Sequence, residues 1–172
     1  MSNKYKKPIL GFSAYSGTGK TTLLVKLLPL LKEKGLSIAM IKHAHHDFDV
    51  DEPGKDSYRL RKAGADQVLL ASNYRRALMM ETPAGEEPRL EELINSLNLE
   101  VVDLVLVEGY RHLSFPKIEL HRPSTNKDLI YPGDNHILAV ASDENIETDG
   151  LPLLDLNDPQ EIADFIQNWL LQ

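Results

Sequence analysis

The chain has 172 residues, with 19 Lys and Arg against 26 Asp and Glu, and its formal net charge is -7. The acidic balance argues against general nucleic-acid binding, which depends on cationic contacts to phosphates, and the absence of cysteine excludes disulfides and thiolate sites. Because no apolar stretch approaches the roughly 20 residues of a membrane span and no secretory signal is recognisable, we expect a single cytoplasmic domain over residues 1–172, without nucleic-acid or membrane partners.

The N-terminal part of the chain predicts a strand, a helix and a second strand. Residues 9–14 form an apolar run that ends in small residues, as a buried strand does. Residues 21–34 carry leucines at helical spacing, and Gly35 is a suitable end for this helix. A second strand is expected over 37–42, and a polar loop over 43–55 follows it.

The rest of the chain predicts more strands than helices. The last helix has the clearest start, because Asp158 is a good N-cap, Pro159 suits the first helical position and Glu161 follows in the first turn. Helices and strands alternate first and strands cluster later, which predicts an α/β fold with a mostly parallel sheet and an antiparallel extension. The other expected elements are a helix over 56–63, a helix within 86–97 that is bounded by Pro88, and strands over 67–71, 76–81, 101–107, 117–121, 137–141 and 153–156.

A glycine-rich segment joins the first predicted strand to the first predicted helix. Its pattern is close to Gly-x-x-x-x-Gly-Lys-Ser/Thr, with a small alanine in place of the first glycine. Its glycines permit backbone conformations that a β-carbon penalises, so that the N–H groups of residues 16–21 ring the phosphates of a nucleotide. Lys20 then reaches the β and γ phosphates, and the Thr21 hydroxyl is a ligand for Mg²⁺. The segment predicts a P-loop NTPase fold of three layers and reads Ala14-Tyr15-Ser16-Gly17-Thr18-Gly19-Lys20-Thr21-Thr22.

A P-loop needs a carboxylate at the tip of a neighbouring strand to hold Mg²⁺. The apolar strand over 101–107 offers Asp103 near its start and Glu108 at its end. Ligands of parallel sheets bind at the carboxyl ends of the strands, and Asp103 lies on the order of 16 Å away from that end. Glu108 is therefore the predicted acid of the Mg²⁺ site, and Gly109 allows the backbone to approach the γ phosphate.

The polar loop after the second strand is rich in His and Asp. One interpretation is a Zn or Ni site, since imidazole and carboxylate suit these metals. A second is a nucleotide-sensing loop, in which Asp47 or Asp56 reaches Mg²⁺-bound water, and a third is an ordinary solvated loop. The position after a strand near the phosphate site favours the sensing loop. The histidines concerned are His43, His45 and His46.

Two residues that flank this loop have specific expected roles. Lys42 ends the second strand and is a candidate for a further phosphate contact. Asp56 is a candidate for the Mg²⁺ site, but it also suits the N-cap of the next helix, and this structural role competes with the metal role.

A carboxylate that accepts from the N1–H and 2-amino groups of guanine would distinguish GTP from ATP. Asn126-Lys127-Asp128 resembles a guanine-reading motif but lacks its spacer and follows a loop. Asp143 directly follows the apolar strand over 137–141 and is better placed. Asp143 is therefore the candidate for base recognition, with a turn-forming role as the alternative.

Four segments recur in a characteristic order between about residue 8 and residue 143. They are Gly-Thr-Gly-Lys-Thr-Thr-Leu, Ile-Lys-His-x-His-His-Asp, Gly-Lys-Asp-Ser-x-Arg-x-x-x-Ala-Gly-Ala and Asp-Leu-Val-Leu-Val-Glu-Gly-Tyr. In this combination they resemble the MobB family of molybdopterin-guanine dinucleotide biosynthesis adapter proteins.

The resemblance implies a GTP-binding homodimer that acts beside the guanylyltransferase attaching GMP to molybdopterin and beside other molybdenum-cofactor proteins. It also implies weak GTP hydrolysis with Mg²⁺, so that Lys20 and Glu108 are the candidate catalytic residues. By position, the resemblance assigns Glu108 to the Mg²⁺ side and assigns the phosphate contacts to Gly17, Gly19, Lys20, Thr21 and Thr22.

Two other functions compete with the adapter role. A small P-loop kinase would need an acceptor pocket and a base near the γ phosphate, and Glu108 could be that base. A metal-delivery GTPase is suggested by the histidine-rich loop, although the lack of cysteine argues against soft metals.

Overall fold

The computed structural model describes residues 5–44, 48–82 and 86–172. The chain forms two compact units, which are described separately. The main unit comprises residues 1–43 and 90–172, and the inserted unit comprises residues 44–89. That the whole chain acts as one domain stays a prediction.

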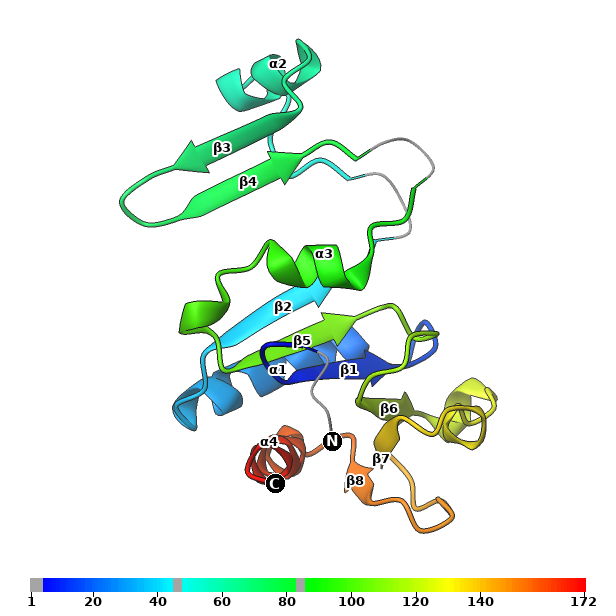
Figure 1. Ribbon diagram of the computed structural model, residues 1–172. Coiled ribbons are helices and arrows are strands. Elements are labelled where there is room, and N and C mark those ends of the chain that lie inside the picture. Colours follow the sequence, from blue (N-terminus) through cyan, green and yellow to red (C-terminus); the bar gives the residue numbers. More distant parts are fainter. Residues whose placement is uncertain (1–4, 45–47, 83–85) are drawn as a thin grey trace. The chain divides into compact units, whose positions relative to one another are not determined.

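The main unit is built on a six-stranded sheet in the order β2-β5-β1-β6-β7-β8 (Figure 1). Every neighbouring pair of strands in this sheet is parallel. The phosphate-loop strand β1 lies between β5 and β6, so the carboxyl ends of all three strands meet at one edge. The strands are β1 (Ile9–Ser13), β2 (Ile38–Lys42), β5 (Leu104–Glu108), β6 (Lys117–His121), β7 (Ile137–Ser142) and β8 (Leu153–Asp155).

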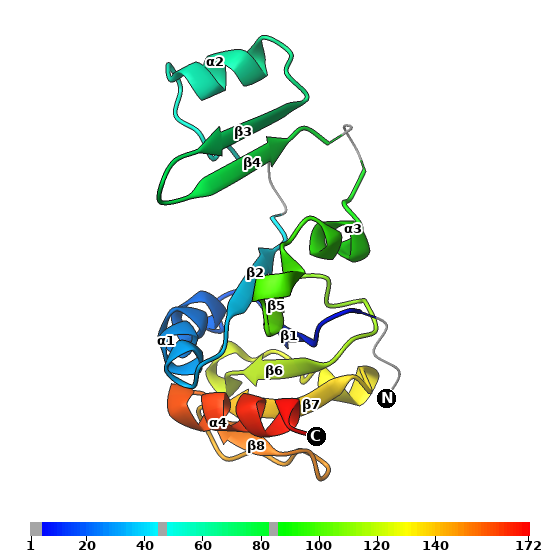
Figure 2. The same cartoon turned by 60° about the vertical axis from the view of Figure 1, so that its left-hand side comes forward.

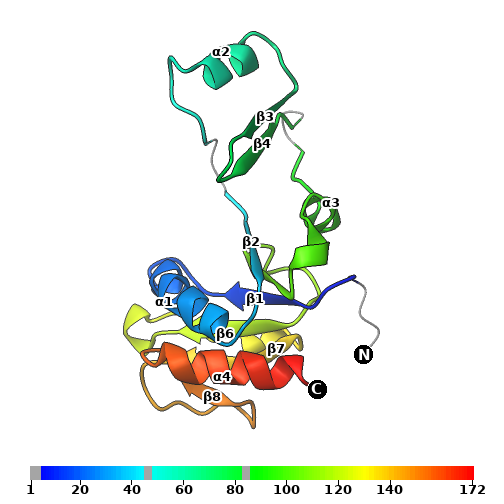
Figure 3. The ribbon, with the colours of Figure 1, turned by 90° about the vertical axis from the view of Figure 1, so that its left-hand side faces the viewer.

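Helices cover both faces of this sheet, which explains why its central strands are apolar on both sides. Helices α1 (Lys20–Glu33) and α4 (Pro159–Leu170) lie side by side on one face (Figure 3). Helix α3 (Leu90–Asn95) lies on the other face (Figure 2). Leu10 packs in the cluster that contains α1 and α4, whereas its neighbour Ile9 packs with α3, as alternation along a strand requires.

The expected elements are present, and the differences at their ends have local causes. The N-cap role of Asp158 is confirmed, because its side chain accepts from the N–H groups of Gln160 and Glu161. Strand β5 begins at Leu104 instead of residue 101, because a 3₁₀ turn (Leu99–Val101) precedes it. Asp103 accepts a 2.8 Å hydrogen bond from the N–H of Ser37 and so joins the starts of β2 and β5.

The inserted unit contains α2 (Asp56–Lys62) and an antiparallel hairpin of β3 (Gln67–Ala71) and β4 (Arg76–Met80). The hairpin forms a sheet of its own. The fold class is thus confirmed as α/β with a mostly parallel sheet, and the antiparallel part is a separate two-stranded sheet. A tight turn joins the two strands, in which the N–H of Ser72 donates a 2.9 Å hydrogen bond to the carbonyl of Arg75.

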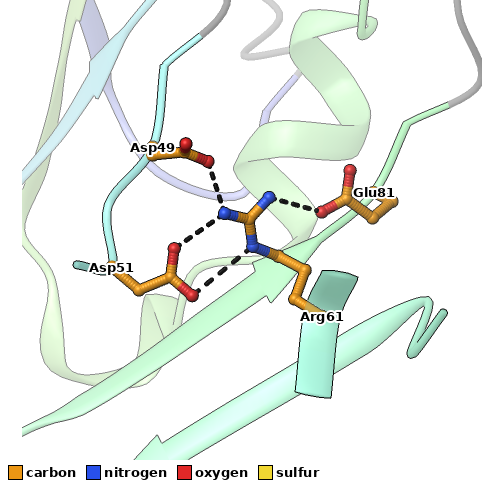
Figure 4. Close-up of polar contacts among 4 residues, drawn as sticks. All are labelled: Asp49, Asp51, Arg61 and Glu81. Atoms are coloured by element: carbon orange, nitrogen blue, oxygen red, sulfur yellow. Dashed lines mark hydrogen bonds and ion pairs between the residues drawn. The ribbon is translucent and has the colours of Figure 1, made fainter. Parts of the chain in front are cut away.

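A guanidinium at the centre of the inserted unit joins three of its segments (Figure 4). Arg61 of α2 donates to Asp49 and Asp51 before the helix and, at 3.1 Å, to Glu81 after β4. The Arg61 side chain is only 10% exposed and that of Asp51 only 4% exposed. The hydrogen bond from Arg61 holds the pKa of Asp51 below its ordinary value, although burial opposes this shift.

One face of the hairpin is apolar and exposed. Leu69 lies opposite Leu78, and Met80 lies opposite Gln67 on the same face. Leu69 is 62% exposed, Leu78 is 51% exposed and Met80 is 47% exposed. A two-stranded sheet is marginal by itself, so this unit depends on α2 and on the Arg61 cluster.

A candidate phosphate-binding site

The loop between β1 and α1 has the backbone geometry that phosphate binding requires. Gly17 and Gly19 adopt φ angles of +86° and +93°, which a side chain would penalise. Gly19 is the N-cap of α1, so the first N–H groups of this 14-residue helix face the loop. Ser16 and Gly17 are exposed, as are Thr21 and Thr22 at the start of the helix. The loop and the start of the helix thus present three residues with hydroxyl groups to solvent.

Hydrogen bonds of a buried threonine and of an arginine after β6 fix the position of this loop. The Thr18 side chain is buried, and its hydroxyl donates a 2.8 Å hydrogen bond to the carbonyl of Tyr15. The Nε of Arg122, directly after β6, donates a 2.9 Å hydrogen bond to the carbonyl of Thr18. Arg122 also lies against Gly19, where an added Cβ would be 3.7 Å from its nearest guanidinium nitrogen. The phosphate loop is therefore supported by the next strand of the sheet.

Three charged side chains meet at the carboxyl edge of the sheet. The Glu108 carboxylate lies 3.6 Å from the Lys20 ammonium and 3.9 Å from the Lys42 ammonium. Lys42 is paired with Glu108 in the β2–β5 register, so both end their strands at the same level. The Glu108 side chain is 12% exposed and that of Lys42 is 60% exposed. The structure thus brings Lys20, Glu108 and Lys42 together, whereas Asp103 lies at the start of β5 beside Ser37.

The close approach of a neighbouring side chain requires glycine at position 109, whether or not a nucleotide is bound. Its φ angle is +107°, and an added Cβ would lie 2.6 Å from the Cβ of His43. The N–H of His43 donates a 2.8 Å hydrogen bond to the carbonyl of Glu108, and its ring lies 4.8 Å from the ring of Tyr110. His43 is therefore packed beside Glu108.

The metal interpretation of the histidine-rich loop gains no support within residues 5–44, 48–82 and 86–172, where no group of three or more His, Asp or Glu side chains could hold a metal ion. His45, His46 and Asp47 lie outside the described residues.

Asp56 belongs to the inserted unit, whereas Thr21 and Glu108 belong to the main unit. The expectation that Asp56 is an N-cap is wrong, because Lys55 occupies that position and Asp56 is the first helical residue. Its side chain is 95% exposed and lies 3.7 Å from Arg59, one turn along α2.

Asp143 follows β7 at the same edge of the sheet as the phosphate loop. Its Oδ2 accepts a 2.5 Å hydrogen bond from Arg122, the residue that also holds Thr18. Its Oδ1 is buried and has no hydrogen-bond partner among the described residues. Arg122 was not predicted from the sequence. The sequence does show an arginine directly after a predicted strand, which is a suitable position for a site residue. Nothing in the sequence, however, places that strand beside β1.

The strand order, the left-handed glycines and the Lys20–Glu108 pair define a P-loop protein with the nucleotide-binding fold of that class. The profile of the family described as "Molybdopterin guanine dinucleotide synthesis protein B" matches residues 9–143. The chain therefore belongs to the MobB family.

Similar proteins support this membership. The molybdopterin-guanine dinucleotide biosynthesis adapter protein of Escherichia coli (strain K12) is 49% identical, over 99% of this chain and 97% of its own length. The protein of the same name from Haemophilus influenzae is 47% identical, over 95% and 89%. A crystal structure of molybdopterin-guanine biosynthesis protein B is 28% identical and has a TM-score of 0.74, covering 95% of this chain and 99% of that one.

Bacillus subtilis MobB, 24% identical with a TM-score of 0.73, shares the fold. It covers 94% of this chain and 96% of its own. Among the described residues of this chain, no helix is both long and apolar enough to cross a membrane.

Proposed function

We propose that this protein is a GTP-binding adapter that assists the attachment of GMP to molybdopterin and works beside the guanylyltransferase. The observation that carries the proposal is the meeting of Lys20, Glu108 and Lys42 at the edge of a P-loop. The adapter role is supported by the names of relatives that are 49% and 47% identical over nearly the whole chain. The proposal includes the cytoplasmic location expected from the sequence.

The phosphates of the nucleotide bind to the loop between β1 and α1. Backbone N–H groups of residues 16–21 surround the β phosphate, and the start of α1 adds a favourable field. Lys20 leaves Glu108 for the β and γ oxygens, because a triphosphate carries more negative charge than one carboxylate. Lys42 lies on the other side of Glu108, 3.9 Å away, and is a second cation for the γ phosphate.

The residues present fit a Mg²⁺ ion. Mg²⁺ prefers hard oxygen ligands and usually keeps several waters, and the main unit offers the Thr21 hydroxyl and the Glu108 carboxylate for this purpose. The bound ion would neutralise charge on the phosphate oxygens. A contribution from Asp56, which belongs to the inserted unit, stays a prediction.

Hydrolysis in this proposal is weak. The segment after β5 contains no glutamine that would position an attacking water, and Arg111 lies 5.8 Å above the ring of Tyr15. Efficient GTPases gain about 10³- to 10⁵-fold from an arginine finger. Phosphate release without any acceptor separates this function from that of a kinase. Turnover at about 1 s⁻¹ or faster without a partner would contradict weak hydrolysis, since typical enzymes reach such rates.

The homodimer is also part of this proposal. The exposed face of the β3–β4 hairpin, with Leu69, Leu78 and Met80, is the kind of apolar surface that a second copy covers. A two-fold axis would place this face against the same face of a second copy. Sedimentation of the parent protein should show a dimer, and sedimentation of Leu78→Glu should show a monomer.

A pull-down from cell extract tests the adapter role. The tagged protein is loaded with Mg²⁺ and a non-hydrolysable GTP analogue, and we expect it to retain the guanylyltransferase. Lys20→Ala should lose this retention, and Lys26→Ala is its matched control, because Lys26 lies on the exposed side of the same helix. Retention that is equal with and without nucleotide, and equal for Lys20→Ala and Lys26→Ala, would show that nucleotide binding does not serve the adapter role.

A further inference from the structure

A cavity of about 580 Å³ lies within the main unit beside the phosphate loop. It is open to solvent and is lined by the loop that leaves β5 and the loop that leads into β7, and Tyr15 of the phosphate loop contributes to its wall. Its volume falls in the range of small-molecule sites, roughly 300–1,000 Å³. Its polar and aromatic lining includes Tyr15, Arg111, His112, Asp134, Asn135 and His136.

The second wall of the cavity is anchored to the sheet by buried charges. The Lys117 ammonium, only 2% exposed, donates a 2.7 Å hydrogen bond to Asp134. Buried Glu119 accepts hydrogen bonds of 2.8 Å from the N–H groups of Ile130 and Tyr131. These side chains alternate with Ile118 and Leu120, which pack toward α1 and α4. The cavity wall therefore lies on the sheet face opposite to those helices and is held in place by side chains of β6.

The charge of the lining favours an anion. Asp134 is the only acid of the lining, and the buried Lys117 already compensates it. His136 also contacts Asp134, with its Nδ1 3.2 Å from the carboxylate. The guanidinium of Arg111 and the imidazole of His112 are exposed at the cavity. Guanidinium groups bind phosphate through two parallel hydrogen bonds.

The shape of the lining favours a planar ring. The guanidinium of Arg111 lies 5.8 Å from the centre of the Tyr15 ring, within the range of cation–π contacts. A flat heteroaromatic ring can stack on either group, and the amide of Asn135 and the ring of His136 supply hydrogen-bond donors and acceptors for its edge. A nucleotide held by the phosphate loop would meet Arg122 and Asp143 after β6 and β7, which do not line this cavity.

The geometry points to a second ligand site in this cavity, for a planar heteroaromatic ring that carries a phosphate group. The choice of a pterin within this class rests on the proposed function. Arg111 binds the phosphate, Tyr15 stacks on the ring, and Asn135 with His136 contacts the ring edge. Because Tyr15 belongs to the phosphate loop, the two ligands occupy adjacent sites, and the protein holds them together for its partner.

Pterin fluorescence tests this site directly with neopterin monophosphate and neopterin as probes. We expect the phosphorylated probe to bind at least tenfold more tightly, as a charge-assisted contact provides. The difference should disappear in Arg111→Gln and persist in Arg75→Gln, which alters an exposed arginine of the inserted unit. Equal affinity of the parent protein for the two probes would overturn the assignment, and this comparison needs no variant.

Competition distinguishes this site from the nucleotide site. The monophosphate titration is repeated with saturating Mg²⁺ and a non-hydrolysable GTP analogue, whose own binding is measured separately. Retained binding of the probe supports two adjacent sites, and competitive displacement shows that the pterin only occupies the phosphate loop. If the GTP analogue does not bind, the proposed function fails, while the ratio of the two pterin affinities still decides the cavity assignment.

Discussion

The strands of the main sheet and those of the β3–β4 hairpin bury their side chains to very different extents. All five residues of β1 and all five of β6 are buried, whereas four of the five residues of β3 are exposed. The main sheet is covered by helices on both faces, and the hairpin is covered by α2 on one. Apolar packing therefore fixes the edge that carries the phosphate loop, while charges around Arg61 hold the inserted unit together. A binding site whose residues need fixed positions is better placed on the apolar main sheet. A surface that contacts partners is better placed on the inserted unit, which charged side chains hold together.

Matched leucine truncations give the largest expected contrast between the two sheets. Leu106 in β5 is fully buried, and Leu78 in β4 is 51% exposed. Leu106→Ala should cost about 2–5 kcal/mol, because it leaves a cavity in the core, whereas Leu78→Ala should stay within about 0.5 kcal/mol at concentrations low enough for the protein to be a monomer. Urea unfolding is followed by circular dichroism, which reports on both units, and by fluorescence of Trp169, the only tryptophan, which packs against the core of the main unit. Similar costs for the two variants would show that the two sheets do not differ in this way.

Two separate lysines of α1 allow a test of whether the carboxyl edge of the main sheet binds nucleotide. Lys20→Ala should weaken binding of a GTP analogue by more than tenfold, since a charge-assisted contact is worth roughly 1.5–3 kcal/mol. Lys26→Ala, on the exposed side of the same helix, should leave the dissociation constant unchanged. Calorimetric titration of both variants measures this difference, and an unchanged affinity of folded Lys20→Ala would remove the P-loop assignment.

Base selection is expected at Asp143, with an effect of at least tenfold on the ratio of GTP to ATP affinity. Its Oδ1 is buried without a hydrogen-bond partner among the described residues and its Oδ2 accepts from Arg122, so this prediction requires the side chain to turn an oxygen toward the guanine edge. Asp143→Ala should lose the preference and keep phosphate binding. Asp128→Ala is the control, since Asp128 is exposed in the loop after β6. If the control variant loses the preference and Asp143→Ala keeps it, the base pocket lies elsewhere.

The inserted unit should be the part that responds to loss of charge. Arg61→Ala leaves Asp51 without its main partner, so amide hydrogen exchange in α2 and β4 should accelerate while exchange in β1 and β5 stays slow. Arg59→Ala is the matched control, because Arg59 lies on the same helix and is exposed. Equal acceleration in both units would contradict the comparison.

Acid should also weaken the charge cluster of the inserted unit. The pKa of Asp51 is lower in the folded protein than its ordinary value of 3.8, so the folded state favours the ionised form. This contribution to stability is present above pH 3.8 and is lost as the pH falls through the lowered pKa. Hydrogen exchange at decreasing pH, corrected for intrinsic rates, should therefore show the inserted unit opening in this acidic window, and Asp51→Asn should remove the dependence.

Local sequence patterns were sufficient for most elements. Strands β3 and β6 were predicted with the residues that the structure shows, because strand-forming runs bounded by turn residues define them. The phosphate loop was equally clear, since glycine conformation and the Lys-Thr pair are local requirements. The helix expected within 86–97 and bounded by Pro88 is present as α3 over Leu90–Asn95, because a proline is tolerated only before or at the first turn of a helix.

The contacts that complete the site could not be read from local patterns. Arg122 holds a carbonyl more than 100 positions earlier in the chain, and the cavity joins three loops that no periodicity connects. Glycine at position 109 was explained by a phosphate, whereas the structure also requires it for the close approach of His43. Such long-range contacts depend on the order of the strands, which the sequence does not show directly.

The parallel pairing of β1 has a consequence for the newly made chain on the ribosome. Ile9 pairs with Val105 and Gly11 pairs with Lys117, so β1 has no partner strand until most of the protein has emerged. At translation rates of about 5–20 residues per second, this interval lasts roughly 5–20 seconds. The β3–β4 hairpin closes locally in about 1–10 μs once its turn is made. The phosphate loop, although encoded near the start, is therefore fixed in place later than the hairpin that follows it in the chain.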